Sequence, residues 1–370
     1  MKKADVFVIG GGPAGLAAAI AVRQKGFDVT VADGAAPPID KPCGEGLMPD
    51  ALAALRELGI ALGPAEGQAL RGIRFCDTET RVEANFPCAS GVGLRRTALH
   101  EKMIARAEKL GVRMLWKTPV RGLTSDGVLL GDRKFAARWI VGADGIHSRV
   151  RGWNGLAARR DRRDRNSRFA FRQHYRMKPW SNCAEVHWGP SGQVYVTPVA
   201  HDEICVVRIS RQSDLRVASL EEEFPHLAAQ LRDANAISGE RGAVTVAQHL
   251  RRVSRNNVAL LGDASGSVDA ITGEGLCLAF RQALALADAL SSGDLRDYER
   301  AHHRIVRRPF LMSRLLLLLD RAPAVRQRLF RSLAAHPEVF QRLLAVHLGA
   351  SSPTHFASTS ALLAWRLVTA

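Results

Sequence analysis

The 370-residue sequence contains no apolar run long enough to cross a bilayer or to form the core of a secretion signal. The apolar segment at residues 6–9 leads directly into glycines, and the run at residues 315–319 falls far short of the roughly 20 residues that a membrane span requires. Internal repeats and low-complexity tracts are missing as well. These absences predict a globular cytoplasmic protein whose length allows two domains.

Metal-binding and nucleic-acid-binding patterns are also missing. The six cysteines are scattered without the spacing of metal ligands, which predicts free thiols and no metal site. The net charge of +16 comes mainly from arginines spread along the whole chain, while lysine is rare and no recognition motif accompanies the charge. We therefore expect no nucleic-acid partner, and the charge favours anionic small ligands instead.

A glycine-rich fingerprint opens the chain. Residues 10–15 read Gly-Gly-Gly-Pro-Ala-Gly, between a strand expected at residues 6–9 and a helix expected at 16–25, and a second strand at 27–32 ends at an acidic residue. Such a turn lets the backbone approach a pyrophosphate at a helix N-terminus, while the acid accepts hydrogen bonds from a ribose. The pattern predicts dinucleotide binding by Gly10, Gly12, Pro13, Ala14, Gly15 and Asp33.

Two further motifs decide which dinucleotide is bound. Residues 142–151 read Gly-Ala-Asp-Gly-Ile-His-Ser-Arg-Val-Arg, which resembles the D-G-x-x-S-x-V-R signature of single-component flavoprotein monooxygenases. Residues 262–275 begin Gly-Asp-Ala and resemble the G-D motif of the same proteins. With three motifs in the right order, the chain resembles the p-hydroxybenzoate hydroxylase-like superfamily, and the resemblance implies FAD as the cofactor.

The resemblance also implies roles for individual residues. Asp263 would bind a ribityl hydroxyl, and Arg96 would contact FAD from the head of a helix. The helix that opens near Gly275 would direct its positive end at the flavin ring. The sequence departs from the family where Ala270 replaces a proline and Cys277 an asparagine. The remaining cofactor contacts that the motifs imply are Cys43, Gly44, Asp144, Gly145, Gly262, Gly273 and Gly275.

The expected fold class is α/β: a Rossmann-type FAD-binding domain with an inserted, mostly antiparallel β-sheet substrate domain and a helical C-terminal region. We expect the discontinuous FAD-binding domain at residues 1–70, 90–167 and 251–300 and the substrate domain at 71–89 and 168–250. The helical extension covers residues 301–370. Only one glycine fingerprint is present, so no separate nicotinamide domain is expected, and NADPH or NADH would be a co-substrate.

The loop at residues 41–49, Lys-Pro-Cys-Gly-Glu-Gly-Leu-Met-Pro, resembles one shared by geranylgeranyl reductases, hydroxylases and halogenases of this superfamily. In the reductases a cysteine here lies near the flavin and the alkene, so Cys43 either donates a proton or packs. The reductases' Tyr-x-Trp-x-Phe-Pro motif keeps only Pro198, and the halogenases' Trp-x-Trp-x-Ile-Pro segment is missing.

Polar and aromatic residues of the β-rich segment are the substrate-side candidates. His174, His187 and Tyr195 join Cys43 as candidate catalytic residues, because a nearby histidine can deprotonate a phenol. Since side chains alternate along a strand, His187 and Trp188 cannot both face the substrate.

The motifs favour an FAD-dependent monooxygenase that uses NAD(P)H and O2 to hydroxylate or epoxidise an electron-rich aromatic or alkene. A geranylgeranyl-reductase-like double-bond reductase is one alternative, and a flavoprotein that modifies a residue of a partner protein is another. The tail at residues 304–348 repeats Arg and Leu at helical spacing. It forms either helices packed on the FAD domain or a basic surface that docks on a membrane or a partner protein.

Overall fold

The computed structural model describes residues 3–350, apart from 64–65, 88 and 158–166. The last twenty residues of the expected 301–370 extension therefore lie outside the described residues, as does Cys88. The other five cysteines are free thiols, as predicted. Among the described residues, no helix is both long and apolar enough to cross a membrane.

A parallel sheet forms the nucleotide-binding half of the molecule. Its central strand β1 (Lys3–Ile9) lies between β11 (Arg133–Gly142) and β2 (Val29–Ala32), and all three are parallel. β19 (Val258–Leu260) continues the parallel order beside β11, and β8 (Arg113–Leu115) beside β2. The central strands are strongly apolar because the sheet is buried inside the domain. β18 (Ser254–Arg255) forms one edge, antiparallel to β19, while the hairpin of β9 (Val120–Thr124) and β10 (Gly127–Leu130) pairs antiparallel with β11.

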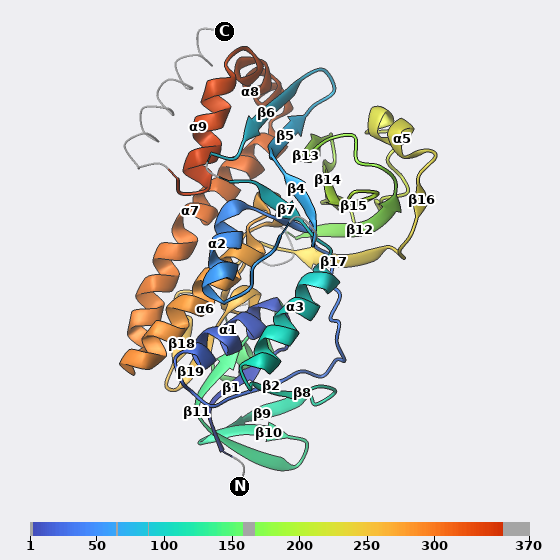
Figure 1. Cartoon of the computed structure of the whole chain (residues 1–370). Coiled ribbons are helices and arrows are strands. Elements are labelled where there is room, and N and C mark those ends of the chain that lie inside the picture. Colours follow the sequence, from blue (N-terminus) through green and yellow to red (C-terminus); the bar gives the residue numbers. More distant parts are fainter. Residues whose placement is uncertain (1–2, 64–65, 88, 158–166, 351–370) are drawn as a thin grey trace.

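Helices from distant parts of the chain pack on this sheet. α1 (Pro13–Gln24) contacts both α3 (Arg96–Lys109) and α6 (Gly275–Ser292), and α2 (Pro49–Glu57) packs on α6. A short helix, α4 (Arg149–Trp153), follows β11. Figure 1 shows α1, α2, α3 and α6 grouped above the sheet, with the β9–β10 hairpin at the opposite end of the molecule from α8.

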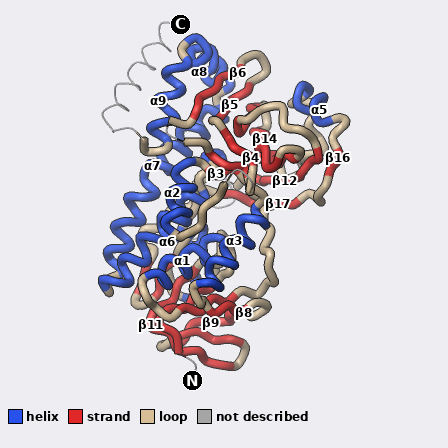
Figure 2. Tube along the Cα trace, viewed as in Figure 1, coloured by secondary structure: helices blue, strands red, loops and turns tan. Residues whose placement is uncertain are grey.

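The second large sheet lies beside the first (Figure 2). Its strand order is β16-β12-β15-β14-β13-β5-β6, β17 pairs with β12, and every pair is antiparallel except β13 with β5. A three-stranded sheet of β3, β7 and β4 lies next to the second large sheet. The helix α5 (Pro225–Leu231) packs on β14 and β15 of the second large sheet. The bounds of these strands are β3 Gly46–Leu47, β4 Gln68–Leu70, β5 Gly72–Cys76, β6 Arg81–Asn85, β7 Gly91–Gly93, β12 Arg168–Arg176, β13 Cys183–Trp188, β14 Gly192–Ala200, β15 Glu203–Ser210, β16 Asn235–Ala236 and β17 Arg241–Thr245.

The C-terminal helices bind the two halves together. α7 (Leu295–Arg321) packs on α6, whereas α8 (Pro323–Ala335) and α9 (Pro337–His347) pack on β6 of the second sheet. Phe330, fully buried, stacks on Phe75 with ring centroids 5.8 Å apart. The predicted packing on the FAD domain therefore describes α7 but not α8 and α9. The fold class, a Rossmann-type domain with an inserted antiparallel sheet and a helical C-terminal region, is confirmed.

Candidate FAD site and substrate cavity

The glycine turn between β1 and α1 has the form that a pyrophosphate requires. Gly10 has φ +110°, in the left-handed region, and a Cβ there would collide with the carbonyl oxygen of Ala143. A Cβ on Gly15 would collide with the carbonyl oxygen of Gly10, whereas Gly12 faces open space. Pro13 opens α1, and Gly12 before it offers no side-chain cap, so the first backbone N–H groups of α1 remain for a ligand.

Asp33 lies at the end of β2, where the sequence placed it. One carboxylate oxygen accepts from the backbone N–H of Gly11 at 2.7 Å, and the other accepts from that of Ala35 at 2.8 Å. The acid is thereby fixed against the glycine turn, at the position where a ribose on this nucleotide-binding edge would reach it.

A cavity of about 850 Å³ begins at this turn, where Pro13, Ala14 and Arg96 line it. The Arg96 Nε is buried and has no hydrogen-bond partner among the described residues. A buried donor of this kind is expected where an anionic ligand binds. Asp263 faces the cavity, so its carboxylate is accessible there although protein surrounds it. This burial raises the Asp263 pKa, against the lowering effect of the Arg96 and Lys41 charges.

The opposite wall of this end is the N-terminus of α6. Gly273 has φ +67° and Gly275 begins the helix, and both line the cavity. Gly262 has φ +61°, and a Cβ there would press on the Ala14 side chain. The turn without Cβ atoms, the unpartnered guanidinium nitrogen and the cavity-facing acid together fit FAD.

Asp144 and Gly145, two further predicted cofactor contacts, form the loop between β11 and α4. The Asp144 carboxylate accepts from the Ser148 hydroxyl at 2.5 Å and from the backbone N–H of Arg149 at 2.7 Å, so it caps α4 and does not line the cavity. Gly145 adopts φ +81° beside it and brings the chain back towards Lys41. The geometry gives both residues a role in shaping the loop.

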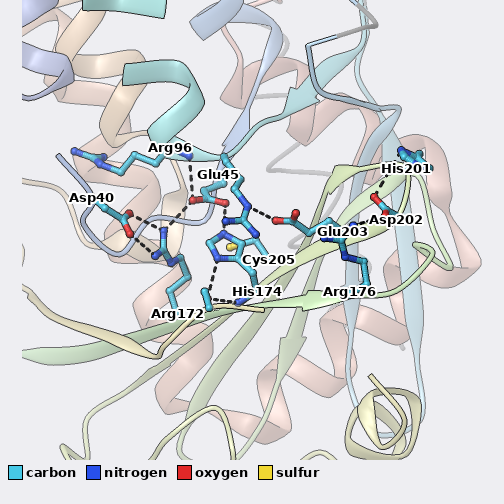
Figure 3. A network of polar contacts seen from close by, with 12 residues as sticks. Asp40, Glu45, Arg96, Arg172, His174, Arg176, His201, Asp202, Glu203 and Cys205 are labelled. Carbon is cyan, nitrogen blue, oxygen red and sulfur yellow. Dashed lines mark hydrogen bonds and ion pairs between the residues drawn. The ribbon is translucent and has the colours of Figure 1, made fainter. Parts of the chain in front are cut away.

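Cys43 and Gly44 line the cavity, and the next residue holds their loop in place. The Glu45 side chain is buried, and its backbone has φ +58°. A non-glycine residue adopts this left-handed conformation only when the surrounding structure stabilises it. One carboxylate oxygen accepts from the Arg96 backbone N–H and from Arg172, both at 3.0 Å. The other lies 2.7 Å from His174 Nε2. Figure 3 shows Glu45 at the centre of these contacts.

The guanidinium of Arg172 also connects this loop to Asp40. It donates to both Asp40 carboxylate oxygens at 2.9 Å (Figure 3). Partial burial alone would raise the Asp40 pKa, but the hydrogen bond and charge of Arg172 lower it below its usual value. Sequence reasoning missed Glu45, Arg172 and Asp40. At these positions the sequence shows an acid between two glycines and an arginine within a strand, and neither feature alone indicates a buried pair.

The predicted catalytic residues separate into two groups. Cys43 and Tyr195 line the cavity, and His174 lies behind Glu45 with its Nδ1 3.1 Å from the Ser238 hydroxyl. The Tyr195 hydroxyl donates to the Ile271 carbonyl at 3.0 Å, and burial raises its pKa.

His187 lies on the other face of β13, because Ala184 and Val186 are the β13 residues that line the cavity. Its Nε2 lies 3.0 Å from the Glu185 carboxylate. The structure therefore brings Cys43, His174 and Tyr195 to one side of the sheet and leaves His187 on the other.

A second buried polar cluster lies where α6 begins. Glu274 is 3% exposed, and one of its carboxylate oxygens has no partner among the described residues. Burial, together with the nearby Asp50 charge, raises the Glu274 pKa to about 8. His347 of α9 lies 3.9 Å away, and burial lowers its pKa to about 4. The Cys277 thiol donates to Asp50 at 3.0 Å, which gives the Cys277 departure a partner.

Among the described residues, two groups each bring three potential metal ligands together, with the ligand atoms of one group within 4.8 Å of one another. One group is Glu45, His174 and Cys205, and the other is Cys76, Glu185 and His187. In each group an arginine forms an ion pair with the carboxylate: Arg172 with Glu45 at 3.0 Å, and Arg74 with Glu185 at 2.6 Å. A guanidinium at that distance repels a second cation, so neither group is built for a metal ion.

The far end of the cavity is apolar. Substrate-sheet residues such as Phe75, Val207 and Ile209 form one wall. The other wall comes from the C-terminal helices: Val306, Phe310, Met312, Leu315, Leu316, Leu318 and Leu319 of α7, Val325, Leu329, Phe330 and Leu333 of α8, and Phe340, Leu343, Leu344 and His347 of α9. The space therefore runs from the glycine turn to a region lined almost entirely by hydrophobic side chains.

Residues 3–293 match the family model described as FAD binding domain. A menaquinone reductase of Mycobacterium tuberculosis is 30% identical over 322 residues, which are 79% of this chain and 78% of that protein. A digeranylgeranylglycerophospholipid reductase of Methanothermobacter thermautotrophicus is 28% identical over 333 residues, 81% of this chain and 82% of that protein. The crystal structure of a flavoprotein/dehydrogenase from Cytophaga hutchinsonii has a TM-score of 0.80 at 19% identity, and the match covers 94% and 93% of the two chains. These matches confirm the resemblance that the three motifs predicted.

Proposed function

Because the chain belongs to the FAD binding domain family, we propose that it is an FAD-dependent reductase of carbon–carbon double bonds in a long isoprenoid chain, with NADPH or NADH as the electron donor. Bound FAD supplies the hydride chemistry. The glycine turn at Gly10–Gly15, Asp33, Arg96, Asp263 and the N-terminus of α6 would hold it. The protein's contribution is to position the substrate, exclude water and deliver a proton.

The observation that carries this proposal is the apolar length of the cavity. An isoprenoid chain is a flexible hydrocarbon, and it gains free energy by leaving water for a wall of leucine and phenylalanine side chains. Of the side chains from α7–α9 that line the cavity, only His347 is polar. A small, polar aromatic substrate would leave this region without complementary contacts.

Saturation of a double bond adds a hydride to one carbon and a proton to the other. Cys43 lines the cavity next to the cofactor-binding end, so its thiol is the candidate proton donor. The Glu45 backbone N–H donates to the Cys43 sulfur at 3.5 Å, and this contact orients the thiol. Tyr195 is less suited to the role because its hydroxyl proton is held by the Ile271 carbonyl.

The names of the two relatives support the same class of reaction. Both are reductases, and both names denote substrates that carry isoprenoid chains. The monooxygenase expected from the flavin motifs stays a prediction, since those motifs hold the cofactor and do not contact the apolar end of the cavity. Modification of a partner protein likewise stays a prediction.

The test is turnover by the FAD-loaded protein of a menaquinone with an unsaturated side chain or of a geranylgeranyl ether lipid. With NADPH or NADH and without O2, mass spectrometry should show products that gain pairs of hydrogen atoms. A product that gains an oxygen atom, formed only in air, would establish the monooxygenase. If neither lipid is altered although NAD(P)H reduces the flavin, the isoprenoid reductase is refuted.

Cys43→Ala tests the proton donor. Removal of the Cys43 thiol should lower turnover by about 100-fold, the usual contribution of a positioned general acid, while FAD binding is retained. Cys76→Ala is the matched control, because Cys76 is a buried thiol on β5 that does not line the cavity. Equal rates for the two variants would assign Cys43 to packing alone.

A further inference from the structure

The apolar end of the cavity opens through side chains that are exposed to solvent. Four of the six large hydrophobic side chains exposed among the described residues lie on α7 and the start of α8. They are Leu311 at 49%, Leu315 at 40%, Leu318 at 61% and Val325 at 49%. Leu315, Leu318 and Val325 also line the cavity, so they form its mouth. We call these four residues the mouth stripe.

The mouth stripe follows one face of α7. Leu311, Leu315 and Leu318 are four and three residues apart, the spacing that stacks side chains on one side of a helix. Figure 1 shows α7 running along the outer side of the molecule, and α8 follows it at the end away from the β9–β10 hairpin. An exposed apolar row that is continuous with a cavity marks an interaction surface.

Every exposed charged side chain in the segment that carries the mouth stripe, residues 304–335, is positive. Residues 304–335 are all described, and the exposed ionisable side chains among them are all arginines: Arg304, Arg307, Arg314, Arg321, Arg328 and Arg331. The single acid in this stretch, Asp320, is buried and pairs with Arg211. Leucines framed by arginines on an interfacial helix complement the hydrocarbon and the phosphates of an anionic bilayer.

We propose that the mouth stripe and its flanking arginines dock on an anionic lipid bilayer, with the cavity opening into the membrane. The apolar side chains enter the boundary between headgroups and acyl chains, and the arginines contact lipid phosphates. A long-chain lipid then passes from the bilayer to the cavity without crossing water. That entry route rests on the proposed function, whereas the docking itself does not.

The experiment is co-sedimentation of the FAD-loaded full chain with vesicles of phosphatidylcholine alone or mixed equally with phosphatidylglycerol. The protein should bind the anionic vesicles, and binding should weaken as salt rises. Arg314→Glu combined with Arg328→Glu should weaken binding roughly thirtyfold or more, because each basic residue near the surface contributes about fivefold. Leu311→Asp should weaken binding about tenfold.

Matched controls separate docking from general charge and stability effects. Arg133→Glu removes an exposed arginine on β11, and Trp153→Ser removes an exposed aromatic on α4, so both should bind like the unmodified protein. If the unmodified protein does not bind anionic vesicles at low salt, or if the mouth variants bind as it does, the docking surface is refuted. A dimer in solution that dissociates in Leu311→Asp would assign the stripe to a second copy and also refute it.

The two proposals fail in different ways. Leu311 does not line the cavity, so Leu311→Asp should still turn over a detergent-dispersed lipid while losing turnover of the same lipid in vesicles. Vesicle binding without turnover in either form would refute the reductase and leave the docking surface standing. Equal turnover by the variant in both forms would refute entry through the mouth.

Discussion

Replacing Glu274 with glutamine should change how the stability of the protein depends on pH. Glu274 is nearly completely buried at the N-terminus of α6, and burial, with the Asp50 charge, raises its pKa from 4.5 to about 8. Between these values the folded protein holds a proton that the unfolded chain releases. The stability of the unmodified protein should therefore fall as pH rises from about 4.5 to about 8.

The size of the effect follows from the shift. Each pKa unit corresponds to about 1.4 kcal/mol, so the shift from 4.5 to about 8 should lower the stability by about 3.5 kcal/mol between pH 5 and pH 8. Glutamine keeps the size and polarity of the protonated acid but cannot ionise. Glu274→Gln should match the unmodified protein near pH 5 and exceed its stability at pH 8. His347 responds in the opposite direction below about pH 6.5, but it is present in both proteins.

Urea unfolding of the FAD-loaded proteins, followed by circular dichroism at several pH values, measures the difference directly. Glu338→Gln is the matched control, because Glu338 is an exposed acid on α9 whose carboxylate lies 3.6 Å from His336 Nδ1. Unfolding midpoints of Glu274→Gln and the unmodified protein that move in parallel from pH 5 to pH 8 would refute the buried-acid reasoning. A lower midpoint for Glu274→Gln at pH 8 would refute it as well.

Three further substitutions follow from the packing. Gly15→Ala should abolish FAD retention, measured as bound flavin absorbance after gel filtration, because the added methyl group meets the Gly10 carbonyl. Phe330→Ala should lower the unfolding free energy by about 3–5 kcal/mol in urea titrations, since the ring is fully buried between the second sheet and the C-terminal helices. Arg172→Leu should lower it by about 3–5 kcal/mol, because it leaves Glu45 buried without its guanidinium partner. Preserved stability in Arg172→Leu would show that His174 alone supports the acid.

The FAD-binding half of the molecule was predictable because its signals are local. The glycine turn, the strand before it and the acid after the next strand lie within about thirty residues, and each has a physical reason for its place. Alternation along β13 likewise predicted that His187 and Trp188 face opposite sides. The structure adds which side faces the cavity, and this depends on where the sheet packs and not on the strand itself.

The contacts that hold the Cys43 loop in place could not be predicted from local signals. Glu45 contacts Arg172 and His174, which lie 127 and 129 residues further along the chain, and only the pairing of sheets brings them together. A lone acid between glycines indicates a turn, and an arginine in a strand indicates a solvent-facing side chain. Each residue alone predicts exposure, whereas the pair is buried because each side chain neutralises the other.

The flavin motifs could not decide between oxygenation and saturation because they lie in the FAD-binding part of the chain, whereas much of the cavity wall comes from α7–α9. The family match ends at residue 293, and α7 begins at Leu295, so the apolar cavity wall formed by α7–α9 comes from beyond the matched region. The same cofactor-binding half can therefore serve different substrates, depending on what the C-terminal helices place over the flavin end of the cavity. In this chain those helices supply leucine and phenylalanine inside and arginine outside. The two properties belong together, because a cavity that accepts a membrane lipid needs an apolar interior and an exit that the membrane can cover.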